Sequence, residues 1–292
     1  MLTGIFFGLI SASLWATTSL AVKAQSARVD TFSFNAFRMA IGALLFLVLL
    51  PFYGGWDALM SLTTLSRAAL GISIICGGVI GDSLYFWSMT QIGAARAMPL
   101  SGIFPIFTWV LAVPILGEPI TPQAIIGTGF VLGGLFMLAP ANAATENKDP
   151  QRNRLGVLAA IIAAMMWALS TTLLKIGLAD GTNIIAINSF RLPLGAIVLS
   201  LLIARFGDKN IWQGYTRASL PLLIGISLLS VGLGSVFWIL SDQYAGAARA
   251  SLVNAMAPLI GAPLAVIFLR ERITWKIALG TCLAVLGVGL VI

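Results

Sequence analysis

Asp82 is the residue whose type and position most directly suggest chemistry. It lies about midway along an apolar stretch, within Gly77-Gly78-Val79-Ile80-Gly81-Asp82-Ser83-Leu84-Tyr85. A carboxylate in hydrocarbon is costly unless it faces water or a partner. Two kinds of role are therefore open. The first is functional, as a protonatable coupling group or a contact for a substrate ammonium group. The second is structural, as a buried partner of Arg38 or a backbone-bonded group in helix packing. Tyr85, about one helical turn away, would present its hydroxyl to the same cavity.

Two arginines and two prolines are candidates for gating. Arg38 and Arg191 each close an Asn-x-Phe-Arg segment about two turns into an apolar stretch. We expect gating contacts at the two ends of the molecule, with snorkelling stems or direct contact with a substrate carboxylate as alternatives. Pro105 and Pro258 lie inside other apolar stretches and predict kinks. A kink that bends during gating and a static one are both compatible with the sequence.

A polar and aromatic stripe predicts the wall of a cavity. Ser11, Trp15 and Thr18 are spaced to share one helix face, and Trp167 and Ser170 repeat the pattern later in the chain. Both tryptophans lie mid-stretch rather than at the membrane interface, where tryptophan is common. We expect these side chains to contact an amphipathic substrate. Packing between helices through the same hydroxyls is the alternative.

The elements that position these residues are membrane-spanning helices. The chain is 59% hydrophobic and 9% charged, and apolar stretches of about 20 residues, the length that crosses hydrocarbon, recur throughout. The predicted spans are roughly 3–22, 32–52, 68–90, 94–116, 122–140, 155–175, 184–204, 219–241, 247–268 and 274–291. Helices satisfy their backbone hydrogen bonds internally. The expected fold class is therefore an all-α membrane protein with ten transmembrane helices.

Residues 4–140 and 156–292 are near-copies of each other. Trp15 corresponds to Trp167, 152 positions later, and Gly93-Ala94-Ala95-Arg96-Ala97 recurs as Gly246-Ala247-Ala248-Arg249-Ala250. The sequence divides into a first five-helix repeat (1–140), a polar linker (141–154) and a second five-helix repeat (155–292). An odd number of spans inverts the second half, an architecture typical of secondary transporters that bind substrate between their repeats. Gly127/Gly134 and Gly280/Gly287 predict close packing of the last span of each half.

The charge pattern predicts topology. The formal net charge is +7, and most basic residues fall in the loops on one side, which the positive-inside rule places in the cytoplasm. We expect a multi-pass protein of a bacterial inner membrane, with linker 141–154 cytoplasmic and both termini outside. Lys175 is expected to anchor a span end at the interface, and Glu118 to satisfy helix-end groups. Membrane lipid rather than nucleic acid is the expected partner.

Other function classes find little support. There is no histidine, and Cys76 and Cys282 lie in predicted spans without metal-ligand spacing. No phosphate-binding G-x-x-x-x-G-K-[ST] loop and no dinucleotide fingerprint is present. We therefore expect a protein that is not an enzyme, uses neither cofactor nor metal, and functions as a monomer. A channel fits an inverted repeat with paired kinks less well.

The motif Gly-Ala-Ala-Arg-Ala…Pro…Leu-Gly-Glu-Pro-Ile…Gly (93–127) and its repeat, Gly-Ala-Ala-Arg-Ala…Pro…Leu-Arg-Glu-Arg-Ile…Gly (246–280), resemble the paired EamA domains of the drug/metabolite transporter superfamily. The whole chain is most similar to the YddG-type amino-acid exporters. The resemblance implies a ten-helix basket around a central cavity, exporting amino acids, including aromatic ones, by alternating access. A sugar-phosphate or nucleotide-sugar antiporter and a non-transporting structural membrane protein remain the alternatives.

Overall fold

The computed structural model describes residues 1–26, 28–138, 149–178, 183–207, 211–257, 259–260 and 275–291, and over these residues regular structure is helical without strands. Seven helical stretches among them are long and apolar enough to cross a membrane, and Pro122–Met137 and Cys282–Val291 are shorter apolar helices. The predicted span 247–268 lies partly outside the described residues. The prediction of an all-α membrane protein is confirmed.

The first half contains five apolar helical stretches, of which the third and fourth each comprise more than one element. Its elements are α1 (Leu2–Gln25), α2 (Thr31–Leu49), the short connecting helices η1 (Leu50–Tyr53) and α3 (Gly55–Met60), α4 (Thr64–Ile74), the π-helical turn η2 (Ile75–Gly81), α5 (Asp82–Ile92), α6 (Ala94–Ser101), α7 (Phe104–Leu116) and α8 (Pro122–Leu138). Elements α4, η2 and α5 form one continuous span. The break between α6 and α7 lies just before Pro105, which occupies the first turn of α7. In place of the expected kink, the helix is interrupted between α6 and α7. Pro105 lies in the first turn of α7, where a backbone N–H would have no partner within the helix, so its absence costs little.

The second half repeats this order. Its described elements are α9 (Pro150–Gly177), α10 (Ile184–Phe206), α11 (Leu220–Ser227), the π-helical turn η3 (Leu228–Gly234), α12 (Ser235–Ala245), α13 (Ala247–Asn254) and α15 (Trp275–Val291). Helix α9 begins five residues before the predicted start of its span, because Asp149 caps its N-terminus by accepting a hydrogen bond from the Gln151 N–H at 2.9 Å.

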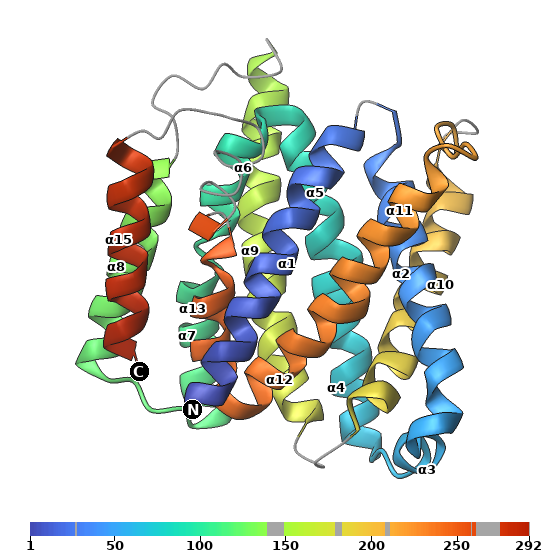
Figure 1. Ribbon diagram of the computed structural model, residues 1–292, viewed down its shortest axis with the longest axis horizontal. Coiled ribbons are helices and arrows are strands. Elements are labelled where there is room, and N and C mark those ends of the chain that lie inside the picture. The colour runs from blue at the N-terminus through green and yellow to red at the C-terminus, as the bar shows by residue number, and fades with distance from the viewer. Residues whose placement is uncertain are drawn as a thin grey trace.

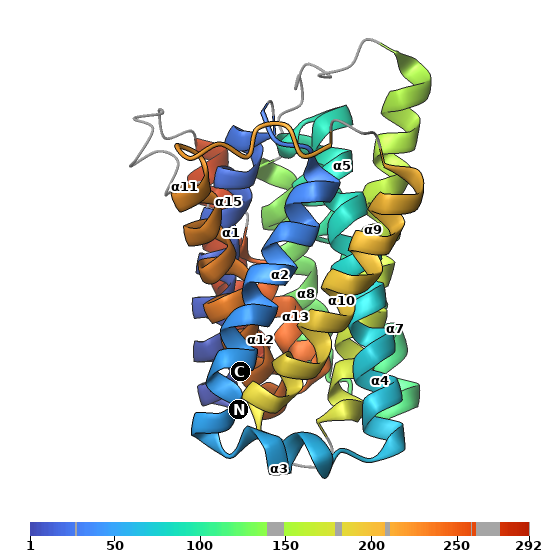
Figure 2. The same ribbon diagram turned by 90° about the vertical axis from the view of Figure 1, so that its right-hand side faces the viewer.

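The two halves pack as an inverted pair. Helices α1 and α9, the first of each half, run in opposite directions (Figure 1). Helix α1 packs on α12 and α9 packs on α5, whereas α2 lies beside α10, α7 beside α13, and α8 beside α15. The α8–α15 pair forms one edge of the molecule in Figure 1, and the α2–α10 pair forms the other, facing the viewer in Figure 2. Each half therefore contributes equivalent helices around a shared centre.

The α8–α15 contact is made by glycines, as their spacing predicts. A Cβ atom added to Gly134 would collide with the carbonyl oxygen of Gly280, and one added to Gly127 would collide with that of Gly287. Gly133, next to Gly134, has open space where its Cβ would be. Only one face of α8 therefore requires glycine, because there the two backbones touch.

We expect Gly134→Ala to destabilise the protein by about 1–3 kcal/mol, because the extra methyl group overpacks a contact between two backbones. Thermal unfolding of purified protein in detergent measures this as a lower Tm. Gly133→Ala is the matched control and should leave the Tm unchanged or slightly raised. Equal effects of the two substitutions would contradict the packing described here.

Candidate functional site

A cavity of about 420 Å³ lies between the two halves. This volume is within the range of about 300–1,000 Å³ that is common for small-molecule sites. Apolar side chains form most of the wall. Its polar and charged lining side chains are Thr18, Ser19, Arg38, Asp82, Ser101, Ser170, Thr171, Asn188, Arg191, Ser230, Ser235 and Asn254. They come from the first four spans of each half, so the cavity belongs to both repeats.

Two π-helical turns directly precede residues that line the cavity. Turn η2 ends directly before Asp82, and turn η3 ends directly before Ser235, the residue in the same register of the second half. Asn35 Nδ2 holds the first turn by donating to the Gly78 carbonyl oxygen at 2.8 Å and to Ser83 Oγ at 2.9 Å. Such turns are frequent at functional sites, because they redirect the side chains that follow.

Asp82 is held by two donors inside the bundle. Arg38 Nη2 forms an ion pair with Asp82 Oδ2, and Trp167 Nε1 donates to Asp82 Oδ1 at 2.8 Å. Arg38 Nη2 also donates to Asn35 Oδ1 at 2.8 Å, and its guanidinium lies 5.0 Å from the Phe86 ring centroid. The Arg38 side chain is 8% exposed and that of Asp82 23%. Arg38 thus points inward to a carboxylate rather than snorkelling outward.

Arg191 occupies the equivalent place in the second half with different partners. Its Nη2 donates to Ser73 Oγ at 3.1 Å, and its guanidinium lies 5.1 Å from the Trp238 ring centroid. Ser73 and Ser170 join α4 to α9, with each hydroxyl donating to the other residue's carbonyl oxygen at 2.8 Å. Arg191 is therefore hydrogen-bonded to the Ser73–Ser170 pair, which joins α4 of the first half to α9 of the second.

Aromatic pairs form two matching walls of the cavity. Trp167 meets Tyr85 edge-on, with ring centroids 5.0 Å apart, and Trp15 meets Trp238 at 5.9 Å. Trp15 and Trp167 correspond in the repeat, as do Tyr85 and Trp238. Each wall combines a tryptophan from the first span of one half with an aromatic residue from the third span of the other.

The structure brings together most of the residues that the sequence singled out. The cavity lining includes Trp15, Thr18, Arg38, Asp82, Tyr85, Trp167, Ser170 and Arg191. Ser11 lies apart: it is fully buried and donates to the Gly234 carbonyl oxygen at 3.2 Å, which joins α1 to η3. Pro105 is also absent from the lining, and Pro258 lies outside the described residues.

Three charged residues lie beside this set. Asp242, which the sequence patterns did not single out, is completely buried one turn beyond Trp238. Lys175 lies in the last turn of α9, and its Nζ donates to the carbonyl oxygens of Asp242 at 2.8 Å and Gln243 at 3.0 Å, satisfying the end of α12. Glu118 accepts from the N–H groups of Ala247 at 2.7 Å and Ala248 at 3.0 Å. It caps α13, as expected of a helix-end group.

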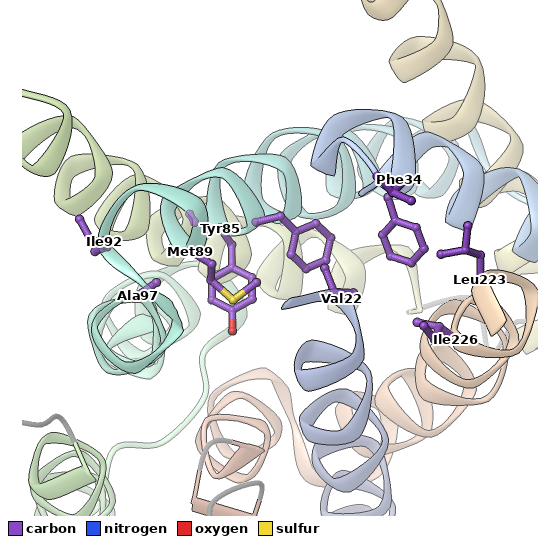
Figure 3. Packing of buried hydrophobic residues seen from close by; sticks show 11 residues of the cluster. Val22, Phe34, Tyr85, Met89, Ile92, Ala97, Leu223 and Ile226 are labelled. Atoms are coloured by element: carbon purple, nitrogen blue, oxygen red, sulfur yellow. The ribbon is translucent and has the colours of Figure 1, made fainter. Parts of the chain in front are cut away.

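Two buried apolar clusters are related by the repeat. The first apolar cluster includes Val22, Phe34, Phe86 and Leu223, and the second includes Leu174, Ile187, Ile239 and Leu70, the same register positions of the other half. Figure 3 shows Val22, Phe34, Leu223 and Ile226 gathered where α1, α2 and α11 meet. Because the halves are inverted, the clusters lie toward opposite ends of the helix bundle. All eight residues are buried.

Comparison with known proteins assigns a family. Residues 2–139 and 154–292 each match the EamA-like transporter family. An uncharacterized transporter of Clostridium kluyveri is 26% identical over 98% of this chain and 92% of its own, and one of Archaeoglobus fulgidus is 25% identical over 97% and 96%. A probable terminal-alkyne amino-acid exporter of Streptantibioticus cattleyicolor is 26% identical over 46% of this chain and 44% of its own.

A solved crystal structure shares the fold. It superposes with a TM-score of 0.78 at 18% identity, covering 99% of this chain and 96% of that one. The relatives just described are named as transporters, which supports a role in transport rather than catalysis.

The Arg38–Asp82 pair predicts a measurable coupling. Asp82→Asn leaves a buried guanidinium without its counter-ion, and we expect a loss of about 3 kcal/mol in unfolding free energy. Arg38→Gln should cost a similar amount, and the double variant much less than the sum. Denaturation in mixed micelles measures all three. Arg152→Gln, which removes an exposed pair with Asp149 at 3.9 Å, should change little; additive losses at Arg38 and Asp82 would contradict the pairing.

Proposed function

We propose that this chain, which belongs to the EamA-like transporter family, is a secondary transporter that exports small amphipathic metabolites, in particular amino acids, including aromatic ones. It is a multi-pass membrane protein of a transporter family, and a small-molecule substrate and a lipid environment follow from that membership. The substrate, the direction and the mechanism are the parts that require support from the site itself.

The two repeat-related apolar clusters are the observation that supports alternating access. In this proposal, the cluster of Val22, Phe34, Phe86 and Leu223 acts as the closure at one end of the cavity, and the cluster of their repeat counterparts acts as the closure at the other. Opening one cluster while the other stays packed exposes the same cavity to alternate sides, the mode of transport that inverted repeats support. One chain holds the whole cavity, which favours function as a monomer.

The cavity wall favours a ring-bearing, weakly charged substrate. Trp15, Trp238, Trp167 and Tyr85 offer faces and edges for stacking. The charged residues in the described lining are Arg38, Asp82 and Arg191, and the first two neutralise each other. A phosphate would favour several converging basic groups, so an amino acid fits better than a sugar phosphate or nucleotide sugar. The amino-acid exporter among the relatives points the same way.

Asp82 is the proposed coupling group if export is driven by a proton gradient. It is the one carboxylate in the described lining, and protonation would release Arg38 and so weaken the contact between α2 and α5. Facilitated diffusion without a coupling ion is the alternative.

For the orientation in the membrane, we propose that linker 141–154 lies in the cytoplasm and both termini outside, as the distribution of basic residues supports.

Counterflow in proteoliposomes tests the substrate class. Vesicles preloaded with unlabelled phenylalanine or threonine should accumulate the labelled amino acid saturably, and buffer-loaded vesicles should not. Trp15→Leu should weaken phenylalanine exchange about three- to tenfold by removing an aromatic contact, with less effect on threonine. Trp109→Leu, at a buried tryptophan outside the lining, is the control. No exchange by folded wild-type protein would rule out amino acids.

The same vesicles test coupling. Asp82→Asn should retain exchange but lose its response to an imposed pH gradient, because the position can no longer bind and release a proton. An unchanged response in Asp82→Asn would assign coupling elsewhere.

Single cysteines at Val22 and Leu174 test alternating access. These residues occupy the same register position in the two clusters and are 4% and 0% exposed. Each cysteine is introduced into the Cys76→Ser/Cys282→Ser variant, and the protein is reconstituted in nanodiscs. A substrate that favours one state should raise maleimide labelling at one position and lower it at the other, because each cysteine is accessible only when its own cluster opens. A channel would label both together, and a static structural protein would show no substrate dependence.

A further inference from the structure

The two halves bind their buried arginines differently, and the difference is a missing carboxylate. Around the Asp82 carboxylate of the first half, Arg38 of the same half and the Trp167 indole N–H of the second half both donate hydrogen bonds. The counterparts of these donors, Arg191 of the second half and Trp15 of the first, are both present. At the register position of Asp82, however, the second half has Ser235, which carries no charge and a shorter side chain. The repeat-related site therefore keeps both donors without their acceptor.

Hydrogen bonding around Arg191 is correspondingly incomplete. Arg191 is 3% exposed, and among the described residues its side chain donates to the neutral hydroxyl of Ser73. Trp15 Nε1 reaches only the Ser230 carbonyl oxygen, at 3.4 Å. Asn188 is fully buried, and its Oδ1 has no donor among the described residues, whereas its counterpart Asn35 accepts from Arg38. A buried cation that lacks a counter-ion is costly, and each unpaired group around it adds to that cost.

Asp242 does not fill the gap. It lies one turn beyond Trp238 on α12 and is absent from the cavity lining. Neither of its carboxylate oxygens has a hydrogen-bond partner among the described residues, and its backbone carbonyl, not its carboxylate, binds Lys175. Asp242 therefore gives the Arg191 guanidinium no hydrogen bond, and no carboxylate pairs with Arg191 among the described residues.

We propose that Arg191 and the Trp15 indole N–H bind the carboxylate of the transported substrate, at the position that the Asp82 carboxylate occupies in the first half. Trp15, Asn188, Arg191 and Ser235 all line the cavity. A guanidinium presents paired N–H donors that match the two oxygens of a carboxylate. The Arg38–Asp82–Trp167 group shows the proposed arrangement within the protein, with the Asp82 carboxylate in the place of the substrate carboxylate. This assignment rests on the proposed transport function and adds a substrate class: organic acids that bear a carboxylate, amino acids included.

The subsite makes the carboxylate, rather than the ammonium group, the part that is recognised. Asp82 is already bonded to Arg38 and Trp167, so a substrate ammonium gains little there. The aromatic pair Trp15–Trp238 lies beside Arg191, whose guanidinium stacks on the Trp238 ring. A ring attached to a carboxylate by a short chain therefore meets both parts of the site.

Thermal stabilisation of the purified protein by matched ligands tests the subsite. The probes are 3-phenylpropionate and its neutral amide, 3-phenylpropionamide, which share the ring and the chain. We expect the acid to raise the Tm and to bind at least about tenfold more tightly than the amide, because charge-assisted hydrogen bonds are the stronger ones. Equal binding of the acid and the amide by the wild-type protein would overturn the proposal.

Ser235→Asp is the decisive variant, because it builds into the second half the carboxylate that the first half already has. It should pair with Arg191 and lower the affinity for 3-phenylpropionate by about tenfold or more, by removing a charge-assisted bond. Ser235→Asn introduces a side chain of the same size as Ser235→Asp but without its charge. The difference in affinity for 3-phenylpropionate between the two variants therefore isolates the effect of the charge. The Tm of Ser235→Asp without ligand should be at least that of Ser235→Asn, which also shows that it folds.

Arg191→Gln gives a second and independent measurement. It should lose the preference for acid over amide, whereas Arg191→Lys should keep part of it. Acid binding that is equal in Ser235→Asp and Ser235→Asn, or a preference that survives Arg191→Gln, overturns the subsite. Counterflow of phenylalanine reports separately on the proposed function. If phenylalanine is exchanged but the acid and the amide bind equally, only the carboxylate subsite is rejected. If the acid binds preferentially but phenylalanine is not exchanged, only the transport of amino acids is rejected.

Discussion

The cost of leaving a charged group in an apolar interior without a partner determines how the centre of this protein is built. Arg38 and Arg191 lie deep in their spans and are nearly inaccessible, so each must find its hydrogen-bond partners inside the protein. Arg38 finds Asp82 and Asn35, which links α2 to α5. Arg191 finds Ser73, which is itself bonded across to α9. These few bonds join five helices around the cavity: α2, α4, α5, α9 and α10.

Duplication explains both the symmetry of the site and its departures from symmetry. Several features are kept in both halves: the π-helical turns, the asparagine three residues before each arginine, and the tryptophan of each first span. Some residues that face the shared cavity differ between the halves, because one cavity needs only one copy of each contact. Asp82 and Ser235 are such a pair, as are Tyr85 and Trp238.

The sequence predicted what depends on composition and repetition and missed what depends on local backbone geometry. The apolar stretches, the repeat and the glycine spacing of α8 and α15 correspond to the helices and to their packing, since a span length and a close backbone contact each restrict residue type directly. The π-helical turns could not be predicted, because Gly77, Gly78 and Gly81 permit such a turn without requiring it. Ser11 has the spacing of a cavity residue, yet it is bonded to a backbone carbonyl, and spacing cannot separate these two uses of a hydroxyl. Asp242 escaped notice because it falls one residue beyond a predicted span and has no charged counterpart in the first half.

The glycine contact between α8 and α15 has a consequence for how the halves can move. Both helices stand outside the cavity lining, and their backbones touch at two levels, two turns apart along α8. At these two levels the glycine backbones leave no space for even an added methyl group, so the contact resists sliding. In the proposed alternating-access cycle, this contact would limit the movement of one half against the other at the α8–α15 edge. The larger displacements would then fall at the α2–α10 edge opposite, so the α8–α15 pair would act as the hinge of the cycle.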